Sequence, residues 1–303
     1  MPFERRNERE AELVHEAVSP TAWGVAYRRT LSDIPLSKEI FEELEGDLAV
    51  RPEDKEKFDK LRIPEVAPMF EARYKLVSRI IEESKVRQVL EVAAGLSPRG
   101  VSMTQDPDMQ YAELDLAGMM AEKRKIIKAL IEKGTIPPRP NLRLEEGNAL
   151  NAADFMRAIE GFDQGKPIAI ANEGLLRYLT LPEKAALMEN IRAALERFGG
   201  FWVTPDVNTK SNQPTRPGMQ DRIADISKMI GRDVNGNLFG TEEDARAFFE
   251  AAGFRVERYS FTEVSDQMVS PQRLEMKATD AEEMIKNMAV YVMRVNRKEA
   301  KSV

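Results

Sequence analysis

Four residues with polar side chains or special backbone freedom follow short apolar stretches of the sequence. Gly95 comes directly after the first stretch, and a glycine there lets the backbone turn tightly beside a ligand. Asp115 ends the second stretch, and it could accept hydrogen bonds from both hydroxyls of a ribose or cap the following helix. Asn148 offers a donor and an acceptor to an adenine edge, or else is an ordinary turn residue. Glu173 ends the fourth stretch, so together the four residues predict a nucleoside site.

These residues lie where strands and helices are predicted to alternate, from residue 86 onward. Longer periodic segments predict helices, one of which begins with the capping-box pair Thr180 and Glu183. Such alternation is typical of a mainly parallel sheet with helices on both faces, an α/β sandwich of Rossmann-like type. Ligands bind such sheets at the carboxyl ends of the strands, where the four residues lie. Seven strands are expected, at 86–93, 109–116, 142–146, 167–172, 201–205, 254–261 and 288–295.

The remaining segments suggest how the chain is divided. Residues 1–84 are predicted to form an N-terminal helical cap and residues 85–303 the core, with a lid insertion at about 207–240 and a second insert at about 262–286. Arg29 falls on the apolar face of a cap helix. It is either an arginine at the edge of the core with its head in solvent, or a cation that faces a ligand.

The overall composition excludes several classes of protein. The 303 residues include no cysteine and one histidine, His15, so thiol chemistry, disulfides and multi-histidine metal sites are ruled out, and no metal is expected. A formal net charge of −6 argues against a nucleic-acid partner. No apolar run approaches the roughly 20 residues that cross a bilayer, and the charged N-terminus does not look like a signal peptide. We therefore expect a cytoplasmic protein without a membrane partner.

An NAD(P)-dependent oxidoreductase is one alternative, because it would share the sheet and the ribose-binding carboxylate. Its pyrophosphate-binding turn has the pattern G-x-G-x-x-G. Here the first strand runs into Glu91-Val-Ala-Ala-Gly95, which lacks the second and third glycines. The missing glycines disfavour this alternative.

Three motifs that occur in order resemble the leucine carboxyl methyltransferase family, and most closely its bacterial branch of polyketide-type O-methyltransferases. They are Glu91-Val-Ala-Ala-Gly95-Leu-Ser-Pro-Arg99, Glu113-Leu-Asp115 with Lys123 eight residues later, and Glu173-Gly-Leu-Leu-Arg-Tyr178-Leu179. Thr21-Ala22 followed by Arg29 is similar to the N-terminal helical signature of that branch. The resemblance covers about residues 20–206, and beyond it only the general layout matches.

The resemblance implies a class I methyltransferase fold that binds S-adenosylmethionine. By that resemblance, Glu91 and Gly95 would line the methionine and ribose side of the cofactor. Asp115 would hold the ribose hydroxyls, and Asn148 with Ala149 would border the adenine. Asn148 stands where many relatives have aspartate.

The resemblance also implies how the amino-acid end of the cofactor is held. Glu173 would approach the ammonium group. Arg73, in a helix before the first strand, would hold the carboxylate, which a guanidinium fork can bind through two hydrogen bonds. Ser97, like Asn148, departs from the aspartate of many relatives.

The reaction implied is methylation of an oxygen on a small molecule, at a carboxyl or a hydroxyl group. A carboxylate is already ionised at neutral pH and needs no base, whereas a hydroxyl usually does. Tyr178 and Asp206 are the candidate catalytic residues, and Glu173 and His15 are further candidate bases. A relative that binds the cofactor without catalysing transfer is the other alternative. The candidates for binding an anionic acceptor are Tyr27, Arg28 and Arg29.

Overall fold

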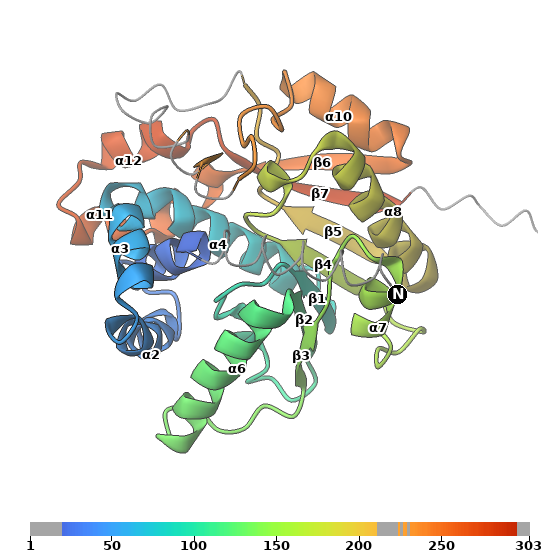
Figure 1. Cartoon of the computed structure of the whole chain (residues 1–303). Helices are drawn as coiled ribbons and strands as arrows, with labels where there is room; N and C mark the ends of the chain where they lie inside the picture. The colour runs from blue at the N-terminus through green and yellow to red at the C-terminus, as the bar shows by residue number, and fades with distance from the viewer. Residues whose placement is uncertain (1–19, 211–223, 225–226, 229–230, 296–303) are drawn as a thin grey trace, which may run out of the picture.

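The computed structural model describes residues 20–210, 224, 227–228 and 231–295 of the chain. Its strands are β1 (Gln88–Val92), β2 (Gln110–Asp115), β3 (Leu142–Glu146), β4 (Ile168–Asn172), β5 (Gly200–Thr204), β6 (Phe254–Ser260) and β7 (Ala289–Val295). They form one sheet in the order β3-β2-β1-β4-β5-β7-β6 (Figure 1). β1 pairs in parallel with β2 and β4, and parallel pairing continues to β3 and to β5. β7 runs antiparallel between β5 and β6.

The alternation of side chains along the central strands explains why helices cover both faces of the sheet. Leu90 and Val92 of β1 turn to one face, whereas Val89 turns to the other. The first face is covered by α7 (Ala152–Ala158), α8 (Leu181–Phe198) and α10 (Glu242–Ala251). The second is covered by α4 (Ala67–Glu83), η3 (Phe261–Gln267) and α12 (Ala278–Ile285). Glu91 follows the alternation of Val89 and so lies on the α4 side.

The predicted α/β sandwich with a mainly parallel seven-stranded sheet is confirmed. The capping box is confirmed as well, because Thr180 and Glu183 exchange hydrogen bonds at the start of α8. Two short helices, α5 (Arg99–Met103) and α7, were not expected from the sequence, whereas α11 (Ser270–Arg273) lies in the second insert, which was predicted to be partly helical. Helices of one or two turns leave little apolar periodicity to recognise.

The helices from residue 20 onward form a cap whose apolar cluster is shared with α6. The cap consists of the helical segment 20–30, α2 (Ser37–Ala49) and α3 (Pro52–Leu61), followed by η1 (Pro64–Val66). Trp23 and Leu44 pack in one cluster with Ile126 of α6 (Ala117–Glu132), beside which α2 lies in Figure 1. In contrast, Leu76 of α4 packs on the sheet. We therefore propose that the boundary between cap and core lies before α4 rather than at residue 84.

The predicted second insert, at about 262–286, folds onto α4. It contains η3, α11 and α12. The buried carboxylate of Glu71 in α4 accepts hydrogen bonds from the backbone N–H groups of Val269 and Ser270, at 2.8 and 2.7 Å. These contacts make the segment part of the helical layer on that face of the sheet.

The predicted lid insertion, at about 207–240, is described at 207–210, 224, 227–228 and 231–240. Thr209 and Phe239 form an isolated parallel bridge there, and the side chains of Val234 and Phe239 are buried. Both ends of the insertion therefore pack on the core. The helix predicted at 219–230 falls largely outside the described residues.

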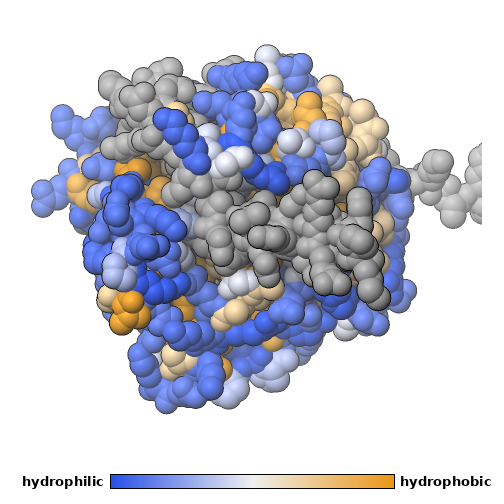
Figure 2. Space-filling model, viewed as in Figure 1, coloured by the Kyte–Doolittle hydropathy of each residue, from blue (hydrophilic) through white to orange (hydrophobic). Residues whose placement is uncertain are grey.

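The face of the molecule shown in Figure 2 is mostly hydrophilic, with hydrophobic residues in small areas. Within the described part of the chain, no helix combines the length and the apolar character that crossing a membrane requires.

Candidate functional site

The carboxyl ends of β2 and β4 bring two predicted site residues to either side of β1. Val92 of β1 is the register partner of both Leu114 of β2 and Asn172 of β4. The next residues of those two strands, Asp115 and Glu173, therefore flank the end of β1. The chain order of the sheet reverses at β1, and α/β sheets bind ligands at such a switch point.

Asp115 holds the turn that follows β1. Its Oδ2 accepts a hydrogen bond from the backbone N–H of Gly95 at 2.7 Å, and its Oδ1 accepts one from Leu116 at 2.8 Å. Gly95 has a φ of 50°, a left-handed conformation that costs other residues about 1–2 kcal/mol. The N-cap of α6 is Leu116, without a side-chain cap, so Asp115 does not cap that helix. Its carboxylate instead fixes the glycine turn at the edge where a ribose would lie.

A buried guanidinium joins Glu91 to Glu173. Arg99, at the start of α5, is 0% exposed, and it forms ion pairs with Glu91 through Nη1 and with Glu173 through Nη2. Its Nε donates to the Ser78 hydroxyl at 3.0 Å. Its guanidinium carbon lies 4.4 Å from the ring centroid of Tyr74. Arg99 thus connects the ends of β1 and β4 to α4 in one buried cluster.

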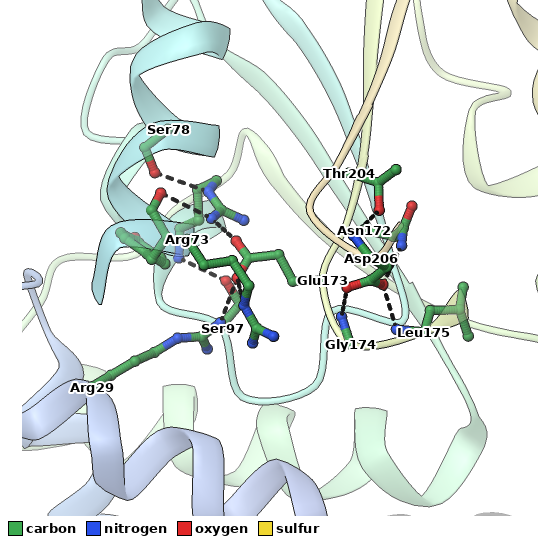
Figure 3. A network of polar contacts seen from close by, with 12 residues as sticks. Arg29, Arg73, Ser78, Ser97, Asn172, Glu173, Gly174, Leu175, Thr204 and Asp206 are labelled. Atoms are coloured by element: carbon green, nitrogen blue, oxygen red, sulfur yellow. Dashed lines mark hydrogen bonds and ion pairs between the residues drawn. The ribbon is translucent and has the colours of Figure 1, made fainter. Parts of the chain in front are cut away.

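Two further arginines approach the other oxygen of Glu173 (Figure 3). Arg73 Nε lies 3.0 Å from Glu173 Oε2, and Arg29 Nη2 lies 3.4 Å from the same atom. Arg29 belongs to the cap and Arg73 to α4, so cap and core meet at this carboxylate. The Arg29 side chain is only 5% exposed, and its Nε has no hydrogen-bond partner among the described residues. Of the two predictions for Arg29, a guanidinium in solvent and a cation that points inward, the structure agrees with the second.

The electrostatics of this cluster keep Glu173 ionised. Burial alone would raise the pKa of the Glu173 carboxyl, but the three neighbouring arginines lower it to about 2. Burial would lower the pKa of Arg99, but Glu173 and Glu91 raise it well above its ordinary value. Burial does lower the pKa of Arg29. Because three guanidiniums face two carboxylates, the cluster has an excess of positive charge.

Asp206 fixes the turn that contains Glu173, as the right side of Figure 3 shows. Its Oδ1 accepts a hydrogen bond from the N–H of Gly174 at 2.7 Å. Its Oδ2 accepts one from the Asn172 side chain and one from the N–H of Leu175, both at 2.7 Å. The residue is 4% exposed. These contacts favour a positioning role for Asp206 over the proton transfer expected from the sequence.

The residues predicted on the adenine side lie in the turn after β3. Asn148 is exposed, and its Oδ1 accepts a hydrogen bond from the N–H of Leu150 at 3.0 Å, which is the contact of an ordinary Asx turn. Ala149 follows it and is half-buried. The N–H of Gly147 donates to the carbonyl of Asp115 at 2.9 Å. The turn is thus joined directly to Asp115, the residue predicted on the ribose side.

Tyr27 and Arg28, two of the three predicted acceptor-binding residues, make contacts that hold the cap together. The ring centroid of Tyr27 lies 5.7 Å from that of Phe41 and 6.1 Å from that of Phe58. Arg28 is 7% exposed, and its Nη2 donates to the carbonyl of Leu61 at 2.7 Å. Arg29 is the one of the three that joins the cluster around Glu173.

Tyr178, the other candidate catalytic residue, ends η2 (Leu176–Tyr178), close after the Glu173 turn in the chain. Its backbone carbonyl accepts a hydrogen bond from Arg232 Nη1 at 2.9 Å, and the same nitrogen contacts both carboxylate oxygens of Glu183. The end of the lid insertion is thereby fastened to η2 and α8. His15 lies outside the described residues.

The second sequence motif contains a buried ion pair between β2 and α6. The side chains of Glu113 and Lys123 are 0% and 2% exposed and contact each other. Burial raises the pKa of Glu113 to about 7, although Lys123 opposes this rise. A Cβ at Gly100 would collide with the Glu113 carboxylate. The ion pair therefore packs directly beneath α5, the helix that begins with Arg99.

Several residues of the cluster were not given a role from the sequence. Arg99 was part of a quoted motif without a function, and Tyr74, Tyr111 and Asn172 were not singled out. The Tyr111 hydroxyl donates to Glu91 Oε2 at 2.8 Å. The only hint of a role for Arg99 in the sequence is its charge, four positions after Gly95. Its two partners, Glu91 and Glu173, come from the ends of different strands. Only the folded sheet brings those partners together.

Solved structures of other proteins share the fold of this chain. A solved O-methyltransferase family protein from Burkholderia thailandensis superposes with a TM-score of 0.51 at 17% identity, over 84% of this chain and 63% of that one. A DUF574 family protein from Streptomyces avermitilis gives 0.50 at 14% identity, over 90% and 97%. At such low identity the likeness concerns the fold alone, which is that of class I methyltransferases.

The family follows from the sequence match. The family model for leucine carboxyl methyltransferase matches residues 27–192, more than half of the chain, so the chain belongs to this family. One relative is a protein of Mycobacteroides abscessus whose name proposes an S-adenosyl-L-methionine-dependent methyltransferase. It is 31% identical over 188 residues, which are 57% of this chain and 56% of that protein. A Mycobacterium avium protein with the same name is 35% identical over 108 residues, 35% of this chain and 34% of its own. The matched region thus spans about half of the first relative and a third of the second.

Proposed function

We propose that this protein is an S-adenosylmethionine-dependent methyltransferase that methylates an oxygen of a small molecule. The observation that supports it most directly is the pair Asp115 and Glu173 on either side of β1, beside an excess of arginine. Membership of the leucine carboxyl methyltransferase family supports the same proposal.

The charges of the cluster fit the amino-acid end of the cofactor, which has one carboxylate and one ammonium group. Glu173 is ionised and would pair with the ammonium. Arg73 would pair with the carboxylate, and Arg29, which contacts the same Glu173 oxygen, would assist it. The buried Nε of Arg29 has no partner among the described residues, so it has a donor to offer an anion. A ligand carboxylate would also balance the excess positive charge.

The nucleoside end fits the neighbouring turns. Asp115 would accept hydrogen bonds from the ribose hydroxyls, since each carboxylate oxygen can accept more than one. Gly95 would let the backbone approach the ribose without a side chain between them. Asn148 and Ala149 would border the adenine at the end of β3.

The bound cofactor supplies a methyl group on a sulfonium, which an oxygen nucleophile can attack. The protein's own residues then align the reactants and exclude water. We favour a carboxylate acceptor, because it needs no base and the sequence has a single histidine. For a hydroxyl acceptor, Tyr178 is the candidate base, since Asp206 is occupied by the turn after β4.

Asp115→Ala is expected to weaken the binding of S-adenosylhomocysteine by about 1–3 kcal/mol, because the ribose hydroxyls lose their acceptor. Isothermal calorimetry of the purified protein measures this change. Asp266→Ala, at an exposed aspartate of η3, is the control and should bind like the wild type. An unchanged affinity in Asp115→Ala would show that the ribose assignment is wrong.

Arg73→Ala is expected to weaken the binding of S-adenosylhomocysteine by about ten-fold or more, while the affinity for adenosine changes little. Adenosine lacks the carboxylate that Arg73 would bind, so the two ligands separate a direct contact from a general disturbance. Calorimetry with both ligands gives the two ratios. Equal losses for the two ligands would remove the carboxylate role of Arg73.

A further inference from the structure

We infer that Arg99 is a positioning residue that holds the Glu173 carboxylate in one orientation, with its Oε2 edge turned toward Arg29 and Arg73, where a ligand's amino-acid group would bind. The inference rests on the proposed function for the identity of the ligand. It adds a residue that acts on the ligand only through Glu173.

The hydrogen bonds of Arg99 explain why it would act indirectly. The guanidinium is 0% exposed, and each of its three nitrogens is bound within the protein. Nε donates to Ser78, Nη1 to Glu91, and Nη2 both to Glu173 and to the carbonyl of Tyr74. The ring of Tyr74 covers one face of the guanidinium. All three guanidinium nitrogens of Arg99 are therefore occupied by protein groups, and none is left to contact a ligand directly.

The two oxygens of Glu173 have different surroundings. Oε1 pairs with Arg99 inside the protein, whereas Oε2 pairs with Arg73 and Arg29. The side chain of Arg73 is 13% exposed, so this second edge lies closer to the solvent. A group that binds one oxygen from inside stops the carboxylate from rotating and leaves the other oxygen for exchange with a ligand.

Glu91 anchors Arg99 from the opposite end. It accepts the Arg99 ion pair on Oε1 and the Tyr111 hydroxyl on Oε2. Contacts thus run without a break from Tyr111 through Glu91 and Arg99 to Glu173, that is, from the start of β2 to the residue after β4. Tyr111 and Glu91 lie within central strands, so the orientation of Glu173 depends on rigid parts of the sheet rather than on a surface loop.

The charged and titratable groups that face Glu173 are Arg99 of α5, Arg73 and Tyr74 of α4 and Arg29 of the cap, and Glu91 of β1 lies behind Arg99 as its second partner. Removing Arg99 takes away the first of these cations and leaves Glu91 without its ion pair. Glu173 would then be easier to protonate, and a protonated carboxyl cannot pair with an ammonium group. Loss of Arg99 should therefore make ligand binding depend on pH.

The test compares the binding of two ligands to the full chain by calorimetry, between about pH 8 and about pH 5. S-adenosylhomocysteine has the amino-acid group, whereas 5′-methylthioadenosine lacks it. In Arg99→Met, we expect S-adenosylhomocysteine to bind about ten-fold or more weakly at pH 7 and weaker still at pH 5, with little change for methylthioadenosine. In the wild type, the affinity for each ligand should stay constant across this range.

Three further variants control for folding and charge. Arg99→Lys keeps the charge, so it should restore the flat pH profile with part of the affinity. Ser78→Ala removes only the partner of Arg99 Nε, and it should give a smaller loss that is confined to S-adenosylhomocysteine. Arg143→Met removes an arginine of β3 that donates a hydrogen bond to a backbone carbonyl and lies over the ring of Phe162. It should change the affinity for neither ligand.

A carbon-13 titration of the Glu173 carboxyl gives a result that needs no ligand. It should show no titration above about pH 4 in the wild type and a clear one in Arg99→Met. If the wild type binds neither ligand, the proposed function fails, while this titration still decides whether Arg99 controls Glu173. The inference is overturned if Arg99→Met or Ser78→Ala lowers the affinity for both ligands equally without a new pH dependence of binding. It is also overturned if the titration of Glu173 is the same in Arg99→Met as in the wild type.

Discussion

Replacing Glu173 with glutamine is expected to lower the free energy of unfolding at neutral pH by about 3 kcal/mol, because three buried or half-buried arginines lose their shared carboxylate. The pKa of Glu173 is lowered from 4.5 to about 2 in the folded protein. A carboxyl with a lowered folded-state pKa stabilises the fold above its ordinary pKa, and this contribution disappears as the pH falls toward the folded value. The difference between wild type and variant should therefore be constant near neutral pH and shrink from about pH 4.5 downward.

Urea unfolding of both proteins over a series of pH values measures this difference. Glu196→Gln is a matched control, because Glu196 pairs with Arg192 at the surface of α8 and its side chain is 52% exposed. Such exposed pairs contribute about 0–1 kcal/mol, so the control should stay close to the wild type. A Glu173→Gln difference that did not decrease in acid would mean that the arginines do not stabilise the ionised form.

The fold could be predicted from the sequence because its signals are local. Strands such as β1 and β4 are short buried runs, and α8 has both a capping box and a regular apolar face. The same local patterns place Asp115 and Glu173 at strand ends. The sheet topology then requires them to lie on either side of β1, so part of the site follows from residues that are distant in sequence.

The partnerships of the arginines could not be predicted in this way. Arg99 and Arg28 are both buried, but one binds two carboxylates and the other binds backbone carbonyls of the cap. Their sequence positions give no hint of this difference, because Glu173 lies 74 residues from Arg99 and the carbonyls that Arg28 binds lie 33 and 35 residues from it. Asp206 is a similar case, since its acceptors are occupied by a turn more than 30 residues earlier. From the sequence, only the carboxylate of Asp206 was known, and a carboxylate at that place suggested a catalytic base.

Gly200→Ala is expected to lower the free energy of unfolding by about 3 kcal/mol or more, because the new methyl group would have no space beside β4. Gly200 begins β5 with a φ of 101°, and it is the register partner of Ile168 in β4. A Cβ at this position would overlap the backbone carbonyl of Ile168, which cannot move without breaking the pairing of the two strands. Gly134 provides the control, since its φ of 74° is also left-handed but a Cβ there would meet nothing within 4 Å.

Gly134→Ala should therefore cost only the conformational strain, about 1–2 kcal/mol, and the difference between the two variants measures the backbone collision. The collision also concerns the site. β4 ends immediately before Glu173, and β5 ends two residues before Asp206, which fixes the Glu173 turn. A shift between these strands should weaken S-adenosylhomocysteine binding in folded Gly200→Ala and leave it unchanged in Gly134→Ala. Equal stability losses in the two variants would show that β4 and β5 can separate at this point without cost.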